Sequence, residues 1–172
     1  RYLEAIEMKP GVALYGGFSG TEETREERDW AVHETIIDAT GLGRATVIGA
    51  DNAILDGFTV TGGEDSGVYC WGCSPTLTNC TISENLDGGV LCFDSFPTLI
   101  NCTISGNTIV DKVDHYYWGG GVTCYGSSPT LTNCTISENM NMEGQGGGFY
   151  CEDNSHPILT NCTISGNTGK MG

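Results

Sequence analysis

The sequence has few basic residues and no long apolar segment. Lysine and arginine together number 7, against 22 aspartates and glutamates, and the formal net charge is −15. Because such a charge repels phosphate backbones and anionic membranes, nucleic-acid binding is excluded as a function. The absence of any run of about 18 apolar residues excludes insertion into a membrane as a transmembrane helix.

Proline and the strong helix formers are also scarce. The 172 residues contain 5 prolines beside 26 glycines, with many Thr, Ser and Asn but few Leu, Lys and Ala. This composition excludes an all-α fold and is typical of tightly turned β-structure. The hydrophobic share of 38% is enough to bury the core of one domain, so the chain is not composed like a disordered segment.

One phrase occurs four times, at residues 74–85, 96–107, 128–139 and 156–167, and its first copy reads SPTLTNCTISEN. The cysteines of these copies are spaced 22, 32 and 28 residues apart: Cys80, Cys102, Cys134 and Cys162. A shorter motif of the form GVYC precedes each copy and ends 10, 10, 10 and 11 residues before these cysteines, at Cys70, Cys92, Cys124 and Cys151. The main length variation falls between the Asn that ends one phrase and the glycines that open the next unit.

A unit of about 22 residues with insertions at one corner is typical of one coil of a parallel β-helix, whereas a propeller blade needs about 40 residues. Within the phrase, Leu77, Cys80 and Ile82 are separated by three and then two residues, so strand alternation breaks once. The upstream stretch AILDGFTVTGG aligns with the phrase at an offset of 22 and places Gly57 on Asn79. Gly and Asn readily adopt positive φ, so their exchange predicts a left-handed bend between two strands.

The bend asparagines are predicted to hydrogen-bond from rung to rung as a ladder. They are Asn79, Asn101, Asn133 and Asn161. Each also begins an Asn-Cys-Thr glycosylation sequon, but the structural role is favoured because every copy of the bend repeats it.

These motifs resemble the right-handed parallel β-helix superfamily, and in particular secreted bacterial repeat proteins related to the polymorphic outer-membrane proteins and pectate-lyase-like solenoids. The residues that carry the resemblance are the openings GGVLC, GGGVTC and GGGFYC and the I-x-x-N closings. It implies an all-β, right-handed parallel β-helix of about seven rungs. We expect one domain over residues 1–172, with irregular first rungs and a charged arm in 1–52 and regular repeats in 53–172. A short helical or irregular lateral arm is expected near residues 19–34, and the chain is expected to be a piece of a longer one.

The nine cysteines form two predicted ladders, one through each motif, with Cys73 left over. We favour small apolar side chains that fill the interior of a narrow coil. Disulfides between neighbouring rungs are a second interpretation, because parallel strands about 4.8 Å apart lie within the Cα range of a disulfide. Metal binding is the third, since Cys70 and Cys73 form a CxxC motif without a second one.

The longest insertion gathers aromatic rings beside acidic residues: Asp111, Asp114, His115, Tyr116, Tyr117 and Trp118. Solenoids place function in loops on one face, so this loop is a candidate glycan site, or alternatively an interface that covers a neighbouring coil. Four acidic residues on the same corner are candidate calcium ligands, although they follow no calcium-loop motif: Asp87, Asp111, Asp114 and Glu143.

No pair of carboxylates recurs on consecutive rungs in a way that marks a catalytic site. The sequence therefore favours an extracellular or cell-surface structural or adhesive solenoid that is not an enzyme and needs no cofactor. End-to-end self-association into a filament is expected if strand edges are open at the ends. The alternative is a carbohydrate-binding or polysaccharide-degrading solenoid, of lyase or glycosidase type, that uses residues 111–118.

Overall fold

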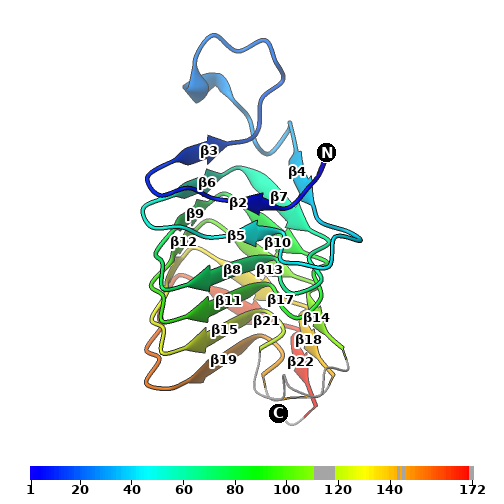
Figure 1. Ribbon diagram of the computed structural model, residues 1–172, viewed down its shortest axis with the longest axis vertical. Coiled ribbons are helices and arrows are strands. Elements are labelled where there is room, and N and C mark those ends of the chain that lie inside the picture. The colour runs from blue at the N-terminus through cyan, green and yellow to red at the C-terminus, as the bar shows by residue number, and fades with distance from the viewer. Residues whose placement is uncertain (111–118, 143, 145, 171–172) are drawn as a thin grey trace.

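The structure is a computed structural model and describes residues 1–110, 119–142, 144 and 146–170. Within these residues the chain winds into a parallel β-helix whose coils stack along one axis (Figure 1). Seven strands form sheet A: β1 (Tyr2–Leu3), β4 (Thr35–Asp38), β7 (Phe58–Thr61), β10 (Thr81–Ser83), β13 (Thr103–Ser105), β17 (Thr135–Ser137) and β21 (Thr163–Ser165). The seven strands of sheet A confirm the predicted fold of about seven rungs.

Two further long sheets and one short sheet complete the coils. Sheet B contains β2 (Ile6–Glu7), β5 (Val47–Ile48), β8 (Val68–Trp71), β11 (Val90–Phe93), β15 (Val122–Tyr125) and β19 (Phe149–Glu152). Sheet C contains β3 (Ala13–Tyr15), β6 (Ile54–Asp56), β9 (Thr76–Thr78), β12 (Thr98–Ile100), β16 (Thr130–Thr132) and β20 (Ile158–Thr160). Sheet D joins β14 (Thr108–Ile109), β18 (Met140–Asn141) and β22 (Thr168–Gly169) at the corner that takes the insertions. No helix in the described ranges is long and apolar enough to cross a membrane.

The repeat sets the register of the coil. Thr81 pairs with Thr103, and Leu77 pairs with Leu99, so equivalent residues of successive phrases lie on neighbouring strands. The bend predicted between β9 and β10 is confirmed, because Asn79 has φ 53° and Gly57, one coil earlier, has φ 80°. Identical side chains are therefore stacked about 4.8 Å apart along the axis.

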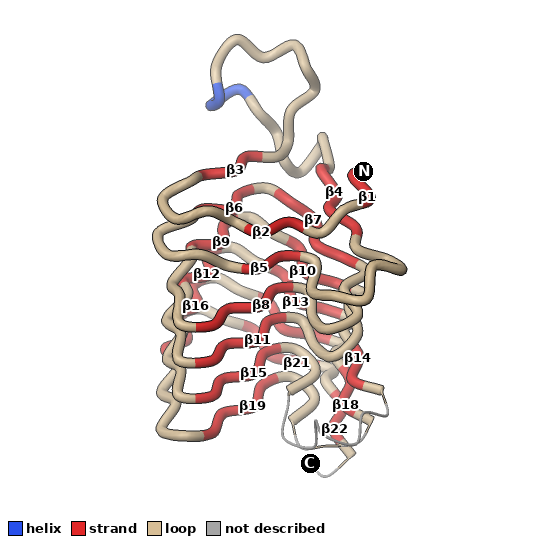
Figure 2. Tube along the Cα trace, viewed as in Figure 1, coloured by secondary structure: helices blue, strands red, loops and turns tan. Residues whose placement is uncertain are grey.

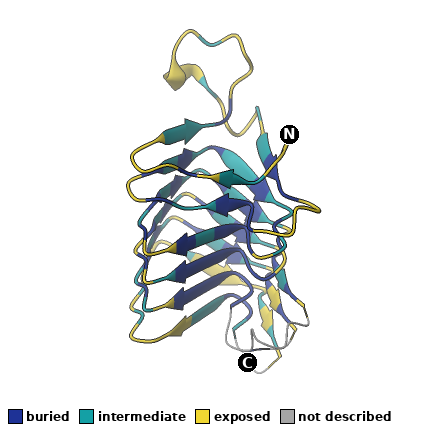
Figure 3. Cartoon of the chain, in the orientation of Figure 1, coloured by how far each residue is buried: buried dark blue, intermediate teal, exposed yellow. Residues whose placement is uncertain are grey.

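The core lies inside the coil, because alternate side chains of each strand point inward and are buried there (Figure 3). Leu55, Leu77, Leu99 and Leu131 form one fully buried column on sheet C. Burying each such side chain contributes about 2 kcal/mol. In the last described rung the equivalent Leu159 is exposed, so this rung covers the core of the preceding rungs while its own inner face has no neighbour among the described residues.

A second asparagine ladder lies inside the coil, at the Asn that ends each phrase. Asn85, Asn107 and Asn139 are buried. In each of them Nδ2 donates to Oδ1 of the asparagine one rung further on at 2.9 Å, and the same Oδ1 accepts the backbone N–H at 2.9–3.1 Å. Each Nδ2 also donates to a backbone carbonyl of the preceding coil, as from Asn107 to Ile82 at 2.9 Å. The ladder from Asn85 to Asn167 thus holds four consecutive coils together at the point where the chain leaves sheet A.

The predicted lateral arm is present and is mostly irregular (Figure 2). Its helical part is a single 3₁₀ turn, η1 (Arg25–Glu27), where Glu27 accepts hydrogen bonds from the Thr24 hydroxyl and the Glu23 backbone. The backbone N–H of Ser19 likewise donates to Glu22 at 2.6 Å, although no helix follows it. The arm forms short acidic turns here because the Glu side chains accept hydrogen bonds from nearby backbone N–H groups, which would otherwise begin a longer helix.

Candidate functional site

The two cysteine ladders line the interior of the coil. Cys70, Cys92, Cys124 and Cys151 pair in register on sheet B, and all nine cysteines are free thiols. In the other ladder each thiol donates to a backbone carbonyl of the preceding coil, as from Cys102 to Leu77 at 3.5 Å. The weak hydrogen bonds and the tight packing indicate that these thiols serve to fill and hold the interior of the coil.

Thiol alkylation tests the three interpretations of the cysteines. Cys151 is exposed and Cys162 is half-buried, whereas the other seven are buried. Native protein is therefore expected to take at most two iodoacetamide adducts, and protein in urea without reductant to take nine, as read by intact mass. Fewer than nine adducts in urea would show disulfides, and a deficit that a chelator reverses would show a bound metal.

The candidate calcium ligands fall mostly outside the described residues. Asp111, Asp114 and Glu143 lie in undescribed segments, while Asp87 is buried in the turn before Gly88. No group of three or more His, Cys, Asp or Glu side chains able to hold a metal ion is found among the residues that the structure describes. The candidate glycan loop, residues 111–118, is also undescribed, and it connects β14 to β15.

The described residues show a different candidate site, an aromatic stripe on the outer face of sheet B. We define the stripe as Tyr69, Trp71, Phe93 and Tyr125. Phe93 pairs in register with Trp71 on one side and with Tyr125 on the other. The stripe therefore crosses three consecutive rungs parallel to the axis of the coil.

The rings of the stripe contact one another and leave ring surface open. The centroids of Tyr69 and Phe93 are 5.8 Å apart, and those of Phe93 and Tyr125 are 6.2 Å apart. Trp71 stands edge-on to Tyr69 at 6.4 Å and is 70% exposed. Partial burial raises the pKa of the Tyr69 hydroxyl above its usual value.

Acidic residues border the stripe at the turns that follow β11 and β19, whereas Gly72 and Gly126 follow β8 and β15. Asp94 comes directly after Phe93 with φ 47°, and Asp153 holds the equivalent turn position two rungs later with φ 53°. Glu152 pairs with Tyr125 and accepts a hydrogen bond from the Tyr150 hydroxyl at 2.7 Å. The stripe thus combines apolar ring surface with exposed carboxylate acceptors along one edge.

Comparison with known protein families agrees with this architecture. The family model described as "right handed beta helix region" matches residues 16–121 and 46–171. The chain belongs to the right-handed beta helix family. No curated protein and no solved structure matches the chain.

In this right-handed beta helix the three long sheets present different chemistry to solvent. The outer face of sheet A carries hydroxyls on successive strands, with Thr81 paired to Thr103 and Ser83 to Ser105. Beside it the bend asparagines form their own ladder, in which Asn101 donates to Asn79 and Asn133 to Asn101, each at 3.2 Å. The aromatic side chains instead gather on sheet B, so the coil has a polar side on sheet A and an aromatic side on sheet B.

The sequence contained a signal for the stripe that motif spacing did not single out. Trp71, Phe93 and Tyr125 each follow directly after a cysteine of the first ladder. Because a strand alternates its faces, a residue beside an inward cysteine points outward. The three residues differ in type, so only their shared position marks them as a stacked set.

Proposed function

We propose that the protein is a non-catalytic, extracellular adhesive β-solenoid that binds an extended polysaccharide along the aromatic stripe. The single observation that carries the proposal is the exposure of Trp71 at 70% in line with Phe93 and Tyr125. Exposed aromatic side chains in a row mark interaction sites, because their burial by a partner recovers the hydrophobic free energy.

A polysaccharide suits this surface for two chemical reasons. The C–H faces of pyranose rings are apolar and pack on aromatic rings, and sugar hydroxyls donate hydrogen bonds to carboxylates such as Asp94 and Glu152. A linear ligand is favoured because the stripe is itself linear and follows the axis of the coil. The extracellular location is part of the proposal, since extended polysaccharides are components of cell surfaces and matrices.

Binding by the stripe is expected to depend on Trp71. The native protein is first tested by affinity electrophoresis for retardation by soluble β-glucan, xylan, pectin and mannan. For each polysaccharide that retards it, Trp71→Ala should raise the apparent Kd about tenfold, because the most exposed ring of the stripe is lost. The matched control is Tyr2→Ala, which removes a ring that is 57% exposed on β1 of sheet A, a different sheet from that of the stripe. Failure of all four polysaccharides to retard the native protein, or equal losses from the two substitutions, would contradict the proposal.

A further inference from the structure

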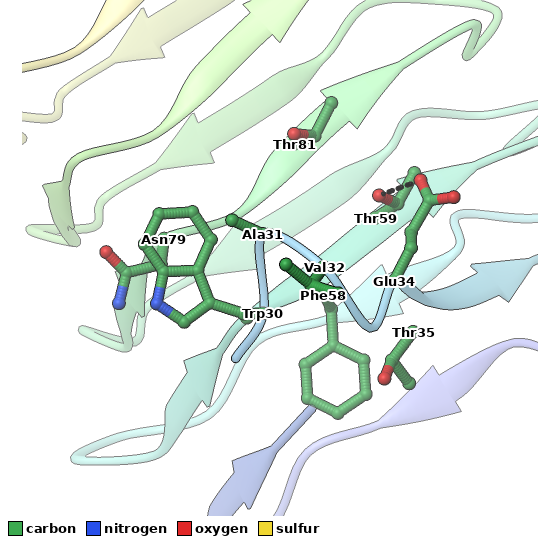
Figure 4. A pocket seen from close by; sticks show the side chains of 10 residues that line it. Trp30, Ala31, Val32, Glu34, Thr35, Phe58, Thr59, Asn79 and Thr81 are labelled. Atoms are coloured by element: carbon green, nitrogen blue, oxygen red, sulfur yellow. Dashed lines mark hydrogen bonds between the residues drawn. The ribbon is translucent and has the colours of Figure 1, made fainter. Parts of the chain in front are cut away.

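A hollow of about 410 Å³ lies between the lateral arm and the outer face of sheet A (Figure 4). One side is the arm segment from Trp30 to Glu34, and the other is formed by Phe58, Thr59 and Thr81 of the sheet. Figure 4 shows the Trp30 ring beside Asn79 at one end of the hollow and Glu34 at the other. The volume lies in the range of small-molecule sites, about 300–1,000 Å³.

The hollow is lined by two aromatic residues, Trp30 and Phe58, and by several groups able to hydrogen-bond a ligand. Trp30 is 42% exposed. One carboxylate oxygen of Glu34 accepts the Thr59 hydroxyl at 2.8 Å. In the part of the chain that the structure describes, the second Glu34 oxygen, the Trp30 indole N–H and the Thr81 hydroxyl have no hydrogen-bond partner. These groups supply one strong acceptor, one donor and one hydroxyl that can serve as either.

The arm is fastened so that these groups keep their places. Arg28 pairs with Asp56 at 2.6 Å, with both side chains largely buried, and donates to the carbonyl of Gly16 at 3.1 Å. The backbone of Asp29 donates to the carbonyl of Gly17 at 2.9 Å. Gly17 has φ 89°, and a Cβ there would meet the Trp30 backbone at 2.6 Å, so the arm lies directly on the first coils. A ligand would therefore meet a preformed site and order little of the protein on binding.

We propose that this hollow binds a single neutral pyranose unit, stacked on the Trp30 ring with its hydroxyls donating to Glu34 and exchanging hydrogen bonds with Thr81. The Glu34 carboxylate and the net charge of −15 disfavour acidic sugars. The hollow lies against sheet A and the stripe lies on sheet B, so the two sites are separate. A protein with both sites holds two glycans on different faces and can cross-link them, which extends the adhesive role.

The tryptophan indole N–H groups give a direct test by two-dimensional ¹⁵N–¹H NMR. Methyl glycosides of glucose, galactose, mannose and N-acetylglucosamine are added singly at about 10 mM, where a Kd of about 1 mM leaves a site largely occupied. We expect at least one of them to shift the Trp30 signal, which Trp30→Phe identifies by its loss. Glu34→Gln, which keeps the side-chain shape, is expected to weaken that binding by about tenfold.

Trp71→Ala is the control for the separate site, and it should leave the Trp30 titration unchanged. The inference is overturned if none of the four glycosides shifts the Trp30 signal, or if Glu34→Gln binds with unchanged affinity. Because the polysaccharide test reads the stripe and this titration reads the hollow, either proposal can fail while the other stands.

Discussion

Asn107→Ala is expected to lower the free energy of unfolding by about 4 kcal/mol. The Asn107 side chain is fully buried and accepts from the backbone and side-chain N–H groups of Asn85. It also donates to the Ile82 carbonyl and to Asn139 Oδ1, each at 2.9 Å. Alanine leaves these groups buried without their partner, and each such loss costs about 1–3 kcal/mol.

Urea unfolding followed by circular dichroism measures this loss as a lower midpoint at constant slope. The matched control is Asn101→Gly in the exposed ladder, where φ is 54° and Gly keeps the bend without strain. Its expected cost is about 1 kcal/mol or less, because water replaces the lost partners. Equal losses for the two variants would refute the special role assigned to the buried ladder.

Gly121→Ala is expected to destabilise the coil by about 3 kcal/mol through steric overlap. A Cβ at Gly121 would overlap the Gly148 carbonyl oxygen and would come within 2.9 Å of both Asn139 Nδ2 and Ile136 Cγ2. The neighbours cannot move away, because Asn139 is held in the buried ladder and Ile136 is in the core. The same contact with a phrase-ending asparagine explains the glycine that begins the GVYC-type motif of each unit: Gly67, Gly89, Gly121 and Gly148.

Gly106→Ala separates this steric effect from simple loss of a glycine. Gly106 has φ 63° with nothing within 4 Å of its Cβ position, and the same turn position holds Glu84 and Glu138 in other coils. Alanine there costs only the left-handed strain, about 1 kcal/mol. In thermal unfolding, the midpoint temperature of Gly121→Ala should lie well below that of Gly106→Ala. The reverse order would contradict the packing argument.

The fold could be predicted because each of its parts recurs. Leu77, Cys80 and Ile82 return in every phrase, and a residue that returns at the same place in each coil must lie above its copies. The bend at Asn79 was predictable for the same reason, since Gly57 replaces it one coil earlier. The role of the phrase-ending asparagines was not predicted, because a sequence does not show whether a polar side chain at a strand end turns inward.

The candidate sites were less predictable from the sequence than the fold. The proposals for residues 111–118 and for calcium stay predictions, because those residues lie outside the described ranges except for Asp87. The aromatic stripe follows from register and strand alternation once the coil is known. The hollow follows from neither, because Trp30 and Glu34 belong to a segment without repeats.

The sequence by itself determined the coil, its period and the side chains that fill it, because each repeated phrase forms the same strands and stacks on the equivalent strands of the preceding coil. Only the tertiary structure decided that Asn107 faces inward while Asn101 faces solvent, and that the Arg28–Asp56 pair fastens the arm so that Trp30 lies over sheet A. The physical reason is that these placements depend on contacts between segments that share no period. Their geometry is set by burial and hydrogen bonding across the whole coil and not by any repeated phrase.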